Sequence, residues 1–309
     1  MTVVSDTRAW VEAGGDGHRL AALGRAGRVA AFTDGDSRVV AAIHPERPAV
    51  GTVGDWVGSS EVLGAAERWL AESGCGAAEG PALLAPWFPH RANLGPYEEP
   101  PIAFEPTERG DRWVAAGYAP LSDSVSILSE HDPQIKAAVD RAGALSSRGW
   151  RLDSVEAGPS STVTGPSYER AVQLVHEIAS RAYADVPGYL PVDASVVADF
   201  YRGVASQIDP RLTLIARDPH GQAAGFVLGA PDGLQPSRKW FSILAVAVVP
   251  EHRSTGLATW LVAAAHRAAS KAGYKAGVHA MVGVSAGVED RTWFRGDVIR
   301  RYALYHKAW

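Results

Sequence analysis

The chain has 309 residues, and 46% of them are hydrophobic, which is enough for packed cores and excludes a disordered or collagen-like chain. At this length we expect two domains of ordinary size. The 30 basic and 34 acidic residues give a net charge of −4, which lacks the basic excess of proteins that bind phosphate backbones, so nucleic acid is not expected as a partner.

Taken in chain order, the predicted elements follow one plan twice. The plan is two strands joined by a tight turn, a long strand, a helix closed by glycine, a strand, a short helical segment and a last strand. In the first half we expect these elements at 28–33, 38–43, 50–57, 61–73, 81–87, 111–117 and 124–129. In the second half we expect them at 212–217, 223–228, 240–249, 256–272, 276–281, 290–295 and 299–305. The plan is longer than the strand–helix–strand rhythm of α/β chains in general, so it favours an internal repeat.

Between the halves, Asp132 is a candidate N-cap of a helix and Pro133 a candidate for its first helical position. We therefore predict a first domain over 1–131, a connecting helix over 132–148 and a second domain over 149–309.

The turn that follows Pro250 is the motif that indicates chemistry. Pro250 ends the predicted strand, and Gly256 allows the backbone to approach a ligand closely. The N–H groups at a helix N-terminus are unpaired and carry a partial positive charge, which suits a phosphate or diphosphate. From these residues alone, an ordinary strand–helix loop is the alternative.

The run LAVAVVPEHRSTGLATWLV resembles the acyl-CoA-binding motif R/Q-x-x-G-x-G/A of the GNAT acetyltransferase superfamily, with Arg253, Gly256 and Ala258 at the three fixed positions. The element order from about residue 150 onward also resembles one GNAT domain, in which residues 168–181 and 192–208 resemble the two early helices. The resemblance implies a mixed α/β fold of two GNAT-like domains, each a mostly antiparallel twisted sheet flanked by helices, with a splay between its central strands. It also implies that acyl-CoA lies in this splay, with its diphosphate on the loop. The residues that it assigns to acyl-CoA are Val246, Ala247, Val248, Arg253, Ser254, Thr255, Gly256, Leu257 and Ala258.

The first half resembles the same fold without this motif. Its corresponding residues, 55–60, are DWVGSS, and Asp55 would repel a diphosphate. We expect a degenerate GNAT-like domain that contributes packing and part of the acceptor pocket. A second working CoA site is the alternative.

Many GNAT domains carry an Asn and a Tyr at two places where this chain has Ser285 and Thr292, respectively. The second of these places usually holds the tyrosine that protonates the departing CoA thiolate. Tyr302 and Tyr305 on the last predicted strand are the candidate substitutes. Aromatic packing on a strand face is the alternative for each.

An alkyl amine must lose a proton before it can attack a thioester. His279 is the candidate base, because an imidazole titrates near neutral pH. A buried, hydrogen-bonded histidine is the alternative, and Glu289 and Asp290 are further candidates that could instead cap a helix.

In this superfamily the loop between the first two helices usually determines acceptor specificity. Here that loop contains Tyr183, Asp185 and Tyr189, which suit a small cationic or amine-bearing acceptor. Aromatic residues packed into the core are the alternative. The residues that could form the opposite wall are Trp87, His90 and Tyr97 in the Pro-rich part of the first half.

We therefore predict an N-acyltransferase that moves an acyl group, in the first instance acetyl, from acyl-CoA to a small-molecule amine by direct attack in a ternary complex.

The single cysteine, Cys75, excludes an intramolecular disulfide and disfavours an acyl-cysteine intermediate, and no metal is expected. No apolar run reaches the ~20 residues of a membrane span, and residues 1–10 lack the apolar core of a signal peptide, so we expect a cytoplasmic protein with no membrane partner. The alternatives are an aminoacyl-tRNA-dependent transferase of GNAT-like fold and a CoA-binding sensor without catalysis. The oligomeric state is not predicted.

Overall fold

The computed structural model describes residues 2–4, 7–155, 165–186, 188–284 and 296–309. The strands and helices of the first half are β1 (Thr2–Val4), α1 (Thr7–Glu12), α2 (Gly17–Ala26), β2 (Arg28–Asp34), β3 (Ser37–Ile43), β4 (Val50–Val57), α3 (Ser60–Glu72), β5 (Ala77–Gly80), β6 (Ala92–Asn93), α4 (Gly110–Ala115) and β7 (Ala119–Ser129). Two helices follow, α5 (His131–Lys136) and α6 (Val139–Ser147). The elements of the second half are β8 (Arg151–Ser154), α7 (Gly165–Tyr183), α8 (Ala194–Tyr201), η1 (Arg202–Gln207), β9 (Leu214–Arg217), β10 (Ala223–Pro231), η2 (Pro236–Arg238), β11 (Trp240–Val248), η3 (Pro250–His252), α9 (Leu257–Lys271), β12 (Ala276–Gly283) and β13 (Asp297–Ala308).

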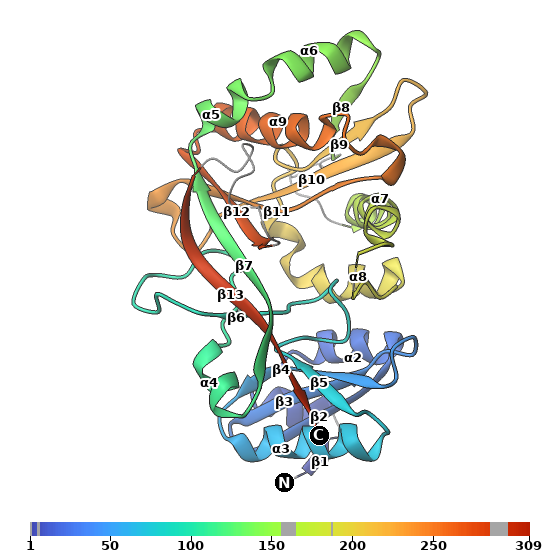
Figure 1. Cartoon of the computed structure of the whole chain (residues 1–309), viewed down its shortest axis with the longest axis vertical. Helices are drawn as coiled ribbons and strands as arrows, with labels where there is room; N and C mark the ends of the chain where they lie inside the picture. The colour runs from blue at the N-terminus through green and yellow to red at the C-terminus, as the bar shows by residue number, and fades with distance from the viewer. Residues whose placement is uncertain (1, 5–6, 156–164, 187, 285–295) are drawn as a thin grey trace.

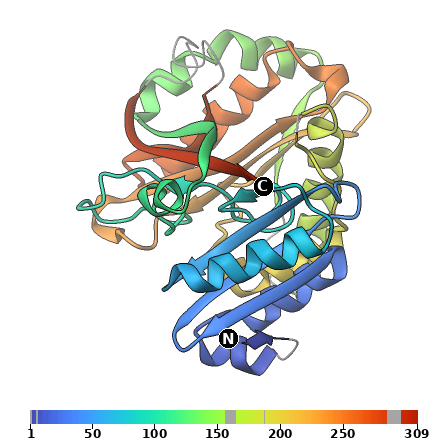
Figure 2. The same ribbon diagram turned by 60° about the horizontal axis from the view of Figure 1, so that its bottom comes forward.

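The predicted mixed α/β fold is confirmed, with helices on both faces of a large sheet. In Figure 1, α9, α5 and α6 lie on one side of the second half's strands, and α7, α8 and strands β1 to β5 of the first half lie on the other. Figure 2 shows α3 lying across the strands of the first half.

The strands of both halves join in one sheet of 13 strands, ordered β1-β2-β3-β4-β5-β13-β7-β12-β11-β10-β9-β8, with β6 on β13. The halves exchange their last strands. β7 pairs with β12 of the second half, whereas β13 pairs with β5 of the first half as well as with β7. These two strands run together between the halves in Figure 1. β7 and β13 pair across the predicted domain boundaries, so the sheet does not divide the chain at those residues. The boundaries stay a prediction.

Two predicted elements need correction. The strand expected at 81–87 is instead β5, which ends at Gly80 before Pro81, a residue without an N–H for a ladder. The residues after Pro81 are apolar because they fill the junction between the halves, where Leu84 and Phe88 are buried. The single helix expected over 132–148 is two helices, α5 and α6, and each of them packs on α9. The helical segment expected at 290–295 lies outside the described residues.

Three buried clusters hold the molecule together. One lies within each half, and the third joins α1, α2 and the segment after β5 to α8. In this third cluster Phe88 and Phe200 contact each other, with ring centroids 4.6 Å apart. The junction between the halves is therefore a packed core that fixes the elements around the site. None of the helices among the described residues is long and apolar enough to cross a membrane.

Candidate active site

The central strands of the second half separate partway along their length. β11 and β12 pair in parallel only from Trp240 and Ala276 to Ile243 and His279. Beyond this point β11 continues with β10 and β12 with β7. We call the resulting gap the opening.

Backbone groups of β11 face the opening. The N–H of Val249 donates to the carbonyl of Ala224 on β10. Because successive residues of an antiparallel strand direct their backbone groups to opposite sides, Val246 and Val248 face away from β10, and Ala247 faces toward it. Val246 and Val248 thus offer the edge that the family resemblance assigns to the pantetheine arm.

The loop after β11 brings the start of α9 to the same end of the opening. Ser254 and Gly256 have left-handed φ values of 63° and 86°, and Gly256 is the N-cap of α9. The first turn of α9 holds no acidic residue, and the N–H groups of Leu257 and Ala258 have no acceptor within the helix. Thr255 donates its hydroxyl to the carbonyl of His252 at 2.7 Å, which holds the turn. The loop therefore has the shape and polarity that favour an anion.

The end of α7 is attached to this loop and strand by three successive residues. Arg181 forms an ion pair with Glu251, and the carbonyl of Ala182 accepts a hydrogen bond from Nη2 of Arg253 at 2.5 Å. Tyr183 donates its hydroxyl to the carbonyl of Val246 at 3.0 Å. The structure therefore places Tyr183 against the strand of the opening, and burial raises the pKa of its hydroxyl to about 12.

The other two predicted acceptor residues lie farther along the loop. Asp185 is exposed. Tyr189 packs edge-on against Trp87, with ring centroids 6.2 Å apart, and Trp87 in turn stacks on His176. Trp87 is one of the three first-half residues that were expected on the opposite wall. The other two have different contacts: His90 bonds the carbonyl of Phe88, and Tyr97 lies under Arg109.

A buried polar cluster lies at the base of the opening, on the side of the sheet away from α9. The hydroxyl of Tyr302 is 3.0 Å from the Ser126 hydroxyl and donates to Oε1 of Glu105 at 3.1 Å. Ser126 in turn accepts a hydrogen bond from the N–H of Met281, where β12 leaves β11. Tyr302, Ser126 and Glu105 line one small cavity of about 10 Å³ together with Ser242, Val278, Ala280 and Met281.

Glu105 is held there by a buried ion pair. Nε of Arg300 lies 3.0 Å from Oε1 of Glu105, and the two side chains are only 2% and 3% exposed. The N–H of Ile102 and the amide of Asn93 also donate to Glu105. Burial raises the pKa of Tyr302 above its usual range, so this hydroxyl keeps its proton at neutral pH.

His279 lies on the opposite side of the sheet, in a chain of three histidines. Its Nε2 is 3.0 Å from Nε2 of His266 on α9, and Nδ1 of His266 is 3.0 Å from Nδ1 of His131. The last ring donates from Nε2 to the carbonyl of Tyr274. Burial lowers the pKa of His279 to about 4, so the ring is neutral. This ring is hydrogen-bonded to His266 of α9, on the side of the sheet opposite Tyr302. We therefore assign His279 no part in the chemistry.

Tyr305 also lies away from the opening. It is buried in the core of the first half, and its strand position pairs with Gly80 of β5. Of the two tyrosines proposed from the last strand, the structure brings only Tyr302 to the opening. The candidates Glu289 and Asp290 lie outside the described residues.

The corresponding gap of the first half is filled by the chain itself. β4 and β5 pair only as far as Thr52 and Glu79. Past this point the carbonyl of Val53 accepts the N–H of Ala82, and the N–H of Asp55 donates to Oε1 of Glu108 at 2.8 Å. The backbone edge that β11 leaves open is therefore occupied in β4.

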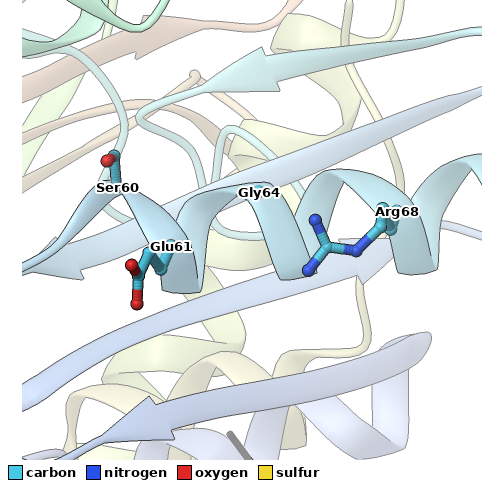
Figure 3. Close-up of a pocket in the computed structure, with 4 residues that line it drawn as sticks. All are labelled: Ser60, Glu61, Gly64 and Arg68. Atoms are coloured by element: carbon cyan, nitrogen blue, oxygen red, sulfur yellow. The ribbon is translucent and has the colours of Figure 1, made fainter.

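The helix that follows β4 is also unlike α9. The hollow on its outer face is lined by Ser60, Glu61, Gly64 and Arg68, all from α3 (Figure 3). Glu61 lies in the first turn, where its charge opposes an anion. The first half thus offers neither the strand edge nor the helix start of an acyl-CoA site.

Replacing Glu108 by Gln should remove a pH-dependent loss of stability. Burial, and then the charge of Asp55, raise the pKa of Glu108 to about 8, so the folded state holds this proton where the unfolded state has lost it. The free energy of unfolding of the wild type should therefore fall, relative to Glu108→Gln, by roughly 3 kcal/mol between pH 5 and pH 8. Urea denaturation at both pH values measures this, with the exposed Glu72→Gln as control. A constant difference between wild type and Glu108→Gln would contradict the assignment.

Comparison with known proteins agrees with this geometry. Residues 174–286 match the family model described as acetyltransferase (GNAT) family. Residues 174–286 therefore form a GNAT-family domain, which contains the opening, the loop and α9. No curated protein sequence matched the chain.

Solved structures extend the likeness to the whole chain. A tandem GNAT protein from the clavulanic acid biosynthesis pathway is 13% identical with a TM-score of 0.52, and the match covers 96% of this chain and 89% of that one. A GCN5-related N-acetyltransferase from Sphaerobacter thermophilus is 16% identical with a TM-score of 0.50, covering 91% and 79%. A protein of unknown function from Enterococcus faecalis, titled a probable N-acyltransferase, is 10% identical with a TM-score of 0.55, covering 94% and 65%. At these identities the likeness concerns the fold, which is that of tandem GNAT proteins.

Several residues at the site were not predicted from the sequence. Glu105 and Asn93 come from the Pro-rich part of the first half, and Ser126 comes from a strand that exchanges between halves. Arg141 of α6 lies against the loop, because a Cβ added to Gly256 would be 2.8 Å from its Cδ. No local pattern marks these residues, since each reaches the site only through tertiary structure.

Proposed function

We propose that this protein transfers an acyl group, most simply acetyl, from acyl-CoA to the amine of a small molecule. The observation that carries the proposal is the separation of β11 from β12, which leads directly into the loop and N-terminus of α9. In this proposal the backbone of Val246 and Val248 pairs with the pantetheine arm, and residues 253–258 hold the diphosphate. The family match supports it.

The proposed reaction is direct attack within a ternary complex. The amine first releases its ammonium proton to solvent. The neutral nitrogen then attacks the thioester carbonyl carbon, whose oxygen is polarised by backbone N–H groups of β11. The C–N bond forms and the C–S bond breaks. The departing sulfur takes a proton from Tyr302, and Tyr302 recovers one from the nitrogen, so that the amide and free CoA are the products.

Tyr302 fits this role because it lies at the base of the opening and keeps its proton at neutral pH. Ser126 and Glu105 hold its hydroxyl in place from two sides. Tyr183 covers the carbonyl of Val246, so we propose that it moves when acyl-CoA binds. The loop that follows it then contacts the acceptor, with Asp185 and Tyr189 as the proposed contacts.

Tyr302→Phe should lower kcat for acetyl transfer by about 10- to 100-fold, because a positioned proton donor is lost. The KM for acetyl-CoA should stay unchanged. Release of CoA thiol from acetyl-CoA is measured with a panel of small amines. Tyr305→Phe is the matched control, because it removes the same hydroxyl from the same strand in the core of the first half.

The alternatives give different results in the same assay. A CoA-binding sensor would bind acetyl-CoA without releasing thiol with any amine. An aminoacyl-tRNA-dependent transferase would show salt-sensitive tRNA binding and no acetyl transfer. Equal kcat for wild type and Tyr302→Phe would contradict the role of Tyr302 as proton donor and would leave the proposed acyl transfer standing.

A further inference from the structure

Arg91 stands out among the charged residues around Tyr302 because its guanidinium has no partner among the residues that the structure describes. It lies just before β6, and its backbone has a left-handed φ of 90°. Its N–H donates to the carbonyl of Pro81. A non-glycine residue in this conformation is costly and persists only when its surroundings determine it.

Arg91 directly precedes β6, the short strand that pairs with the strand of Tyr302. Asn93 pairs with Tyr302 across β6 and β13, and paired residues of antiparallel strands share a face. Both side chains reach Glu105. Arg91 is two residues before Asn93, and its guanidinium interacts electrostatically with Tyr302.

Within the part of the chain that the structure describes, the guanidinium of Arg91 has no hydrogen bond and no carboxylate within ion-pair distance. Arg91 is partly buried, and burial lowers its pKa to about 10, although Tyr302 opposes this shift. Two other shielded arginines are paired with carboxylates: Arg300 with Glu105, and Arg47 with Glu79 at 2.5 Å. A buried charge without a partner costs stability, so its retention points to a ligand.

We propose that Arg91 binds a carboxylate of the acceptor, so that the substrate is a small amino acid or a related amino carboxylate. This inference rests on the proposed function. A planar guanidinium binds a carboxylate through two parallel hydrogen bonds. A phosphate dianion would require a second cation, and the nearby Arg300 is already neutralised by Glu105 and Glu99. Arg91 would hold the carboxylate of the acceptor on the side of Tyr302. The amine of the acceptor would then be free to attack the thioester.

The first test uses thermal unfolding and needs no knowledge of the acceptor. Benzoate and benzamide, which differ in charge but hardly in shape, are compared at equal ionic strength. Benzoate should raise the Tm of the wild type more than benzamide does, and this difference should vanish in Arg91→Met and persist in the exposed control Arg68→Met. Without ligand, Arg91→Met should have the higher Tm, because it removes an unpaired charge.

Equal shifts by benzoate and benzamide in the wild type, or an unchanged difference in Arg91→Met, would overturn the proposal. Arg91→Lys keeps the charge without the two parallel hydrogen bonds, and it should retain a reduced preference for benzoate if Arg91→Met does not fold.

The second test uses turnover with matched amine pairs. Phenylalanine is compared with phenethylamine, and lysine with cadaverine, with acetyl-CoA as donor. The wild type should prefer the carboxylate-bearing member, and Arg91→Met should lose at least tenfold of that preference in kcat/KM. The affinity of both proteins for acetyl-CoA should be equal. Failure of acetyl-CoA to bind the wild type would reject the proposed function, whereas binding without a carboxylate preference would reject only the role of Arg91.

Discussion

Glu105→Gln should lower the free energy of unfolding by about 3 kcal/mol, because it leaves a buried guanidinium without its counter-charge. The side chain of Arg300 is 2% exposed and that of Glu105 is 3% exposed, with 3.0 Å between Nε and Oε1. Glu105 also accepts from Tyr302, Asn93 and Ile102, so the amide of Gln would place two hydrogens where acceptors are needed. Urea denaturation of wild type and variant measures the change.

The same arginine provides a matched control. Nη1 of Arg300 lies 2.8 Å from Oε2 of Glu99, whose side chain is 53% exposed. Because water screens an exposed ion pair, Glu99→Gln should have little effect. The double variant Glu105→Met/Arg300→Met should be more stable than Glu105→Gln, because it leaves no buried charge unpaired. Equal effects of Glu99→Gln and Glu105→Gln would show that the buried pair has no special role.

Thr255→Glu should weaken acetyl-CoA binding by at least about 100-fold, because it places a negative charge beside the diphosphate at a helix N-terminus. Thr255 is exposed and has no left-handed φ, so the substitution adds charge without backbone strain, although it also removes the hydrogen bond to the carbonyl of His252. Gly256→Glu is a poorer test, since Gly256 has a φ of 86° and an added Cβ would lie 2.8 Å from Cδ of Arg141. Isothermal titration with acetyl-CoA measures the affinity.

Gly233→Glu is the control for net charge. No heavy atom lies within 4 Å of a Cβ added at Gly233, so this variant carries the same charge at a distant turn. It should bind acetyl-CoA as the wild type does. Equal binding by Thr255→Glu and wild type would reject the placement of the diphosphate on this loop.

The elements with strong local patterns could be predicted from the sequence. β4 lies at its predicted residues, and α9 begins directly after the predicted Gly256. The residues around Pro250 correctly predicted a strand end, a turn and a helix start, because each of these is determined by neighbouring residues. The apolar run after Pro81 misled the prediction, since burial between the halves and burial in a sheet require the same residue types.

The rest of the site depends on contacts between distant residues. β13 leaves its own half to pair with β5 and β7, and this exchange brings Tyr302 to Glu105 and sends Tyr305 into another core. The ring of His279 could have faced either side of β12. Only the positions of His266 and His131 show that it lies behind the sheet. No local pattern in the sequence contains that information.

The most direct test is a crystal structure of the protein grown with acetyl-CoA. We predict the diphosphate on the backbone N–H groups of residues 254–258 and the pantetheine arm along Val246 and Val248, with the hydroxyl of Tyr183 displaced from the carbonyl of Val246. A diphosphate bound at α3 or elsewhere, with β11 and β12 unoccupied between them, would contradict the account.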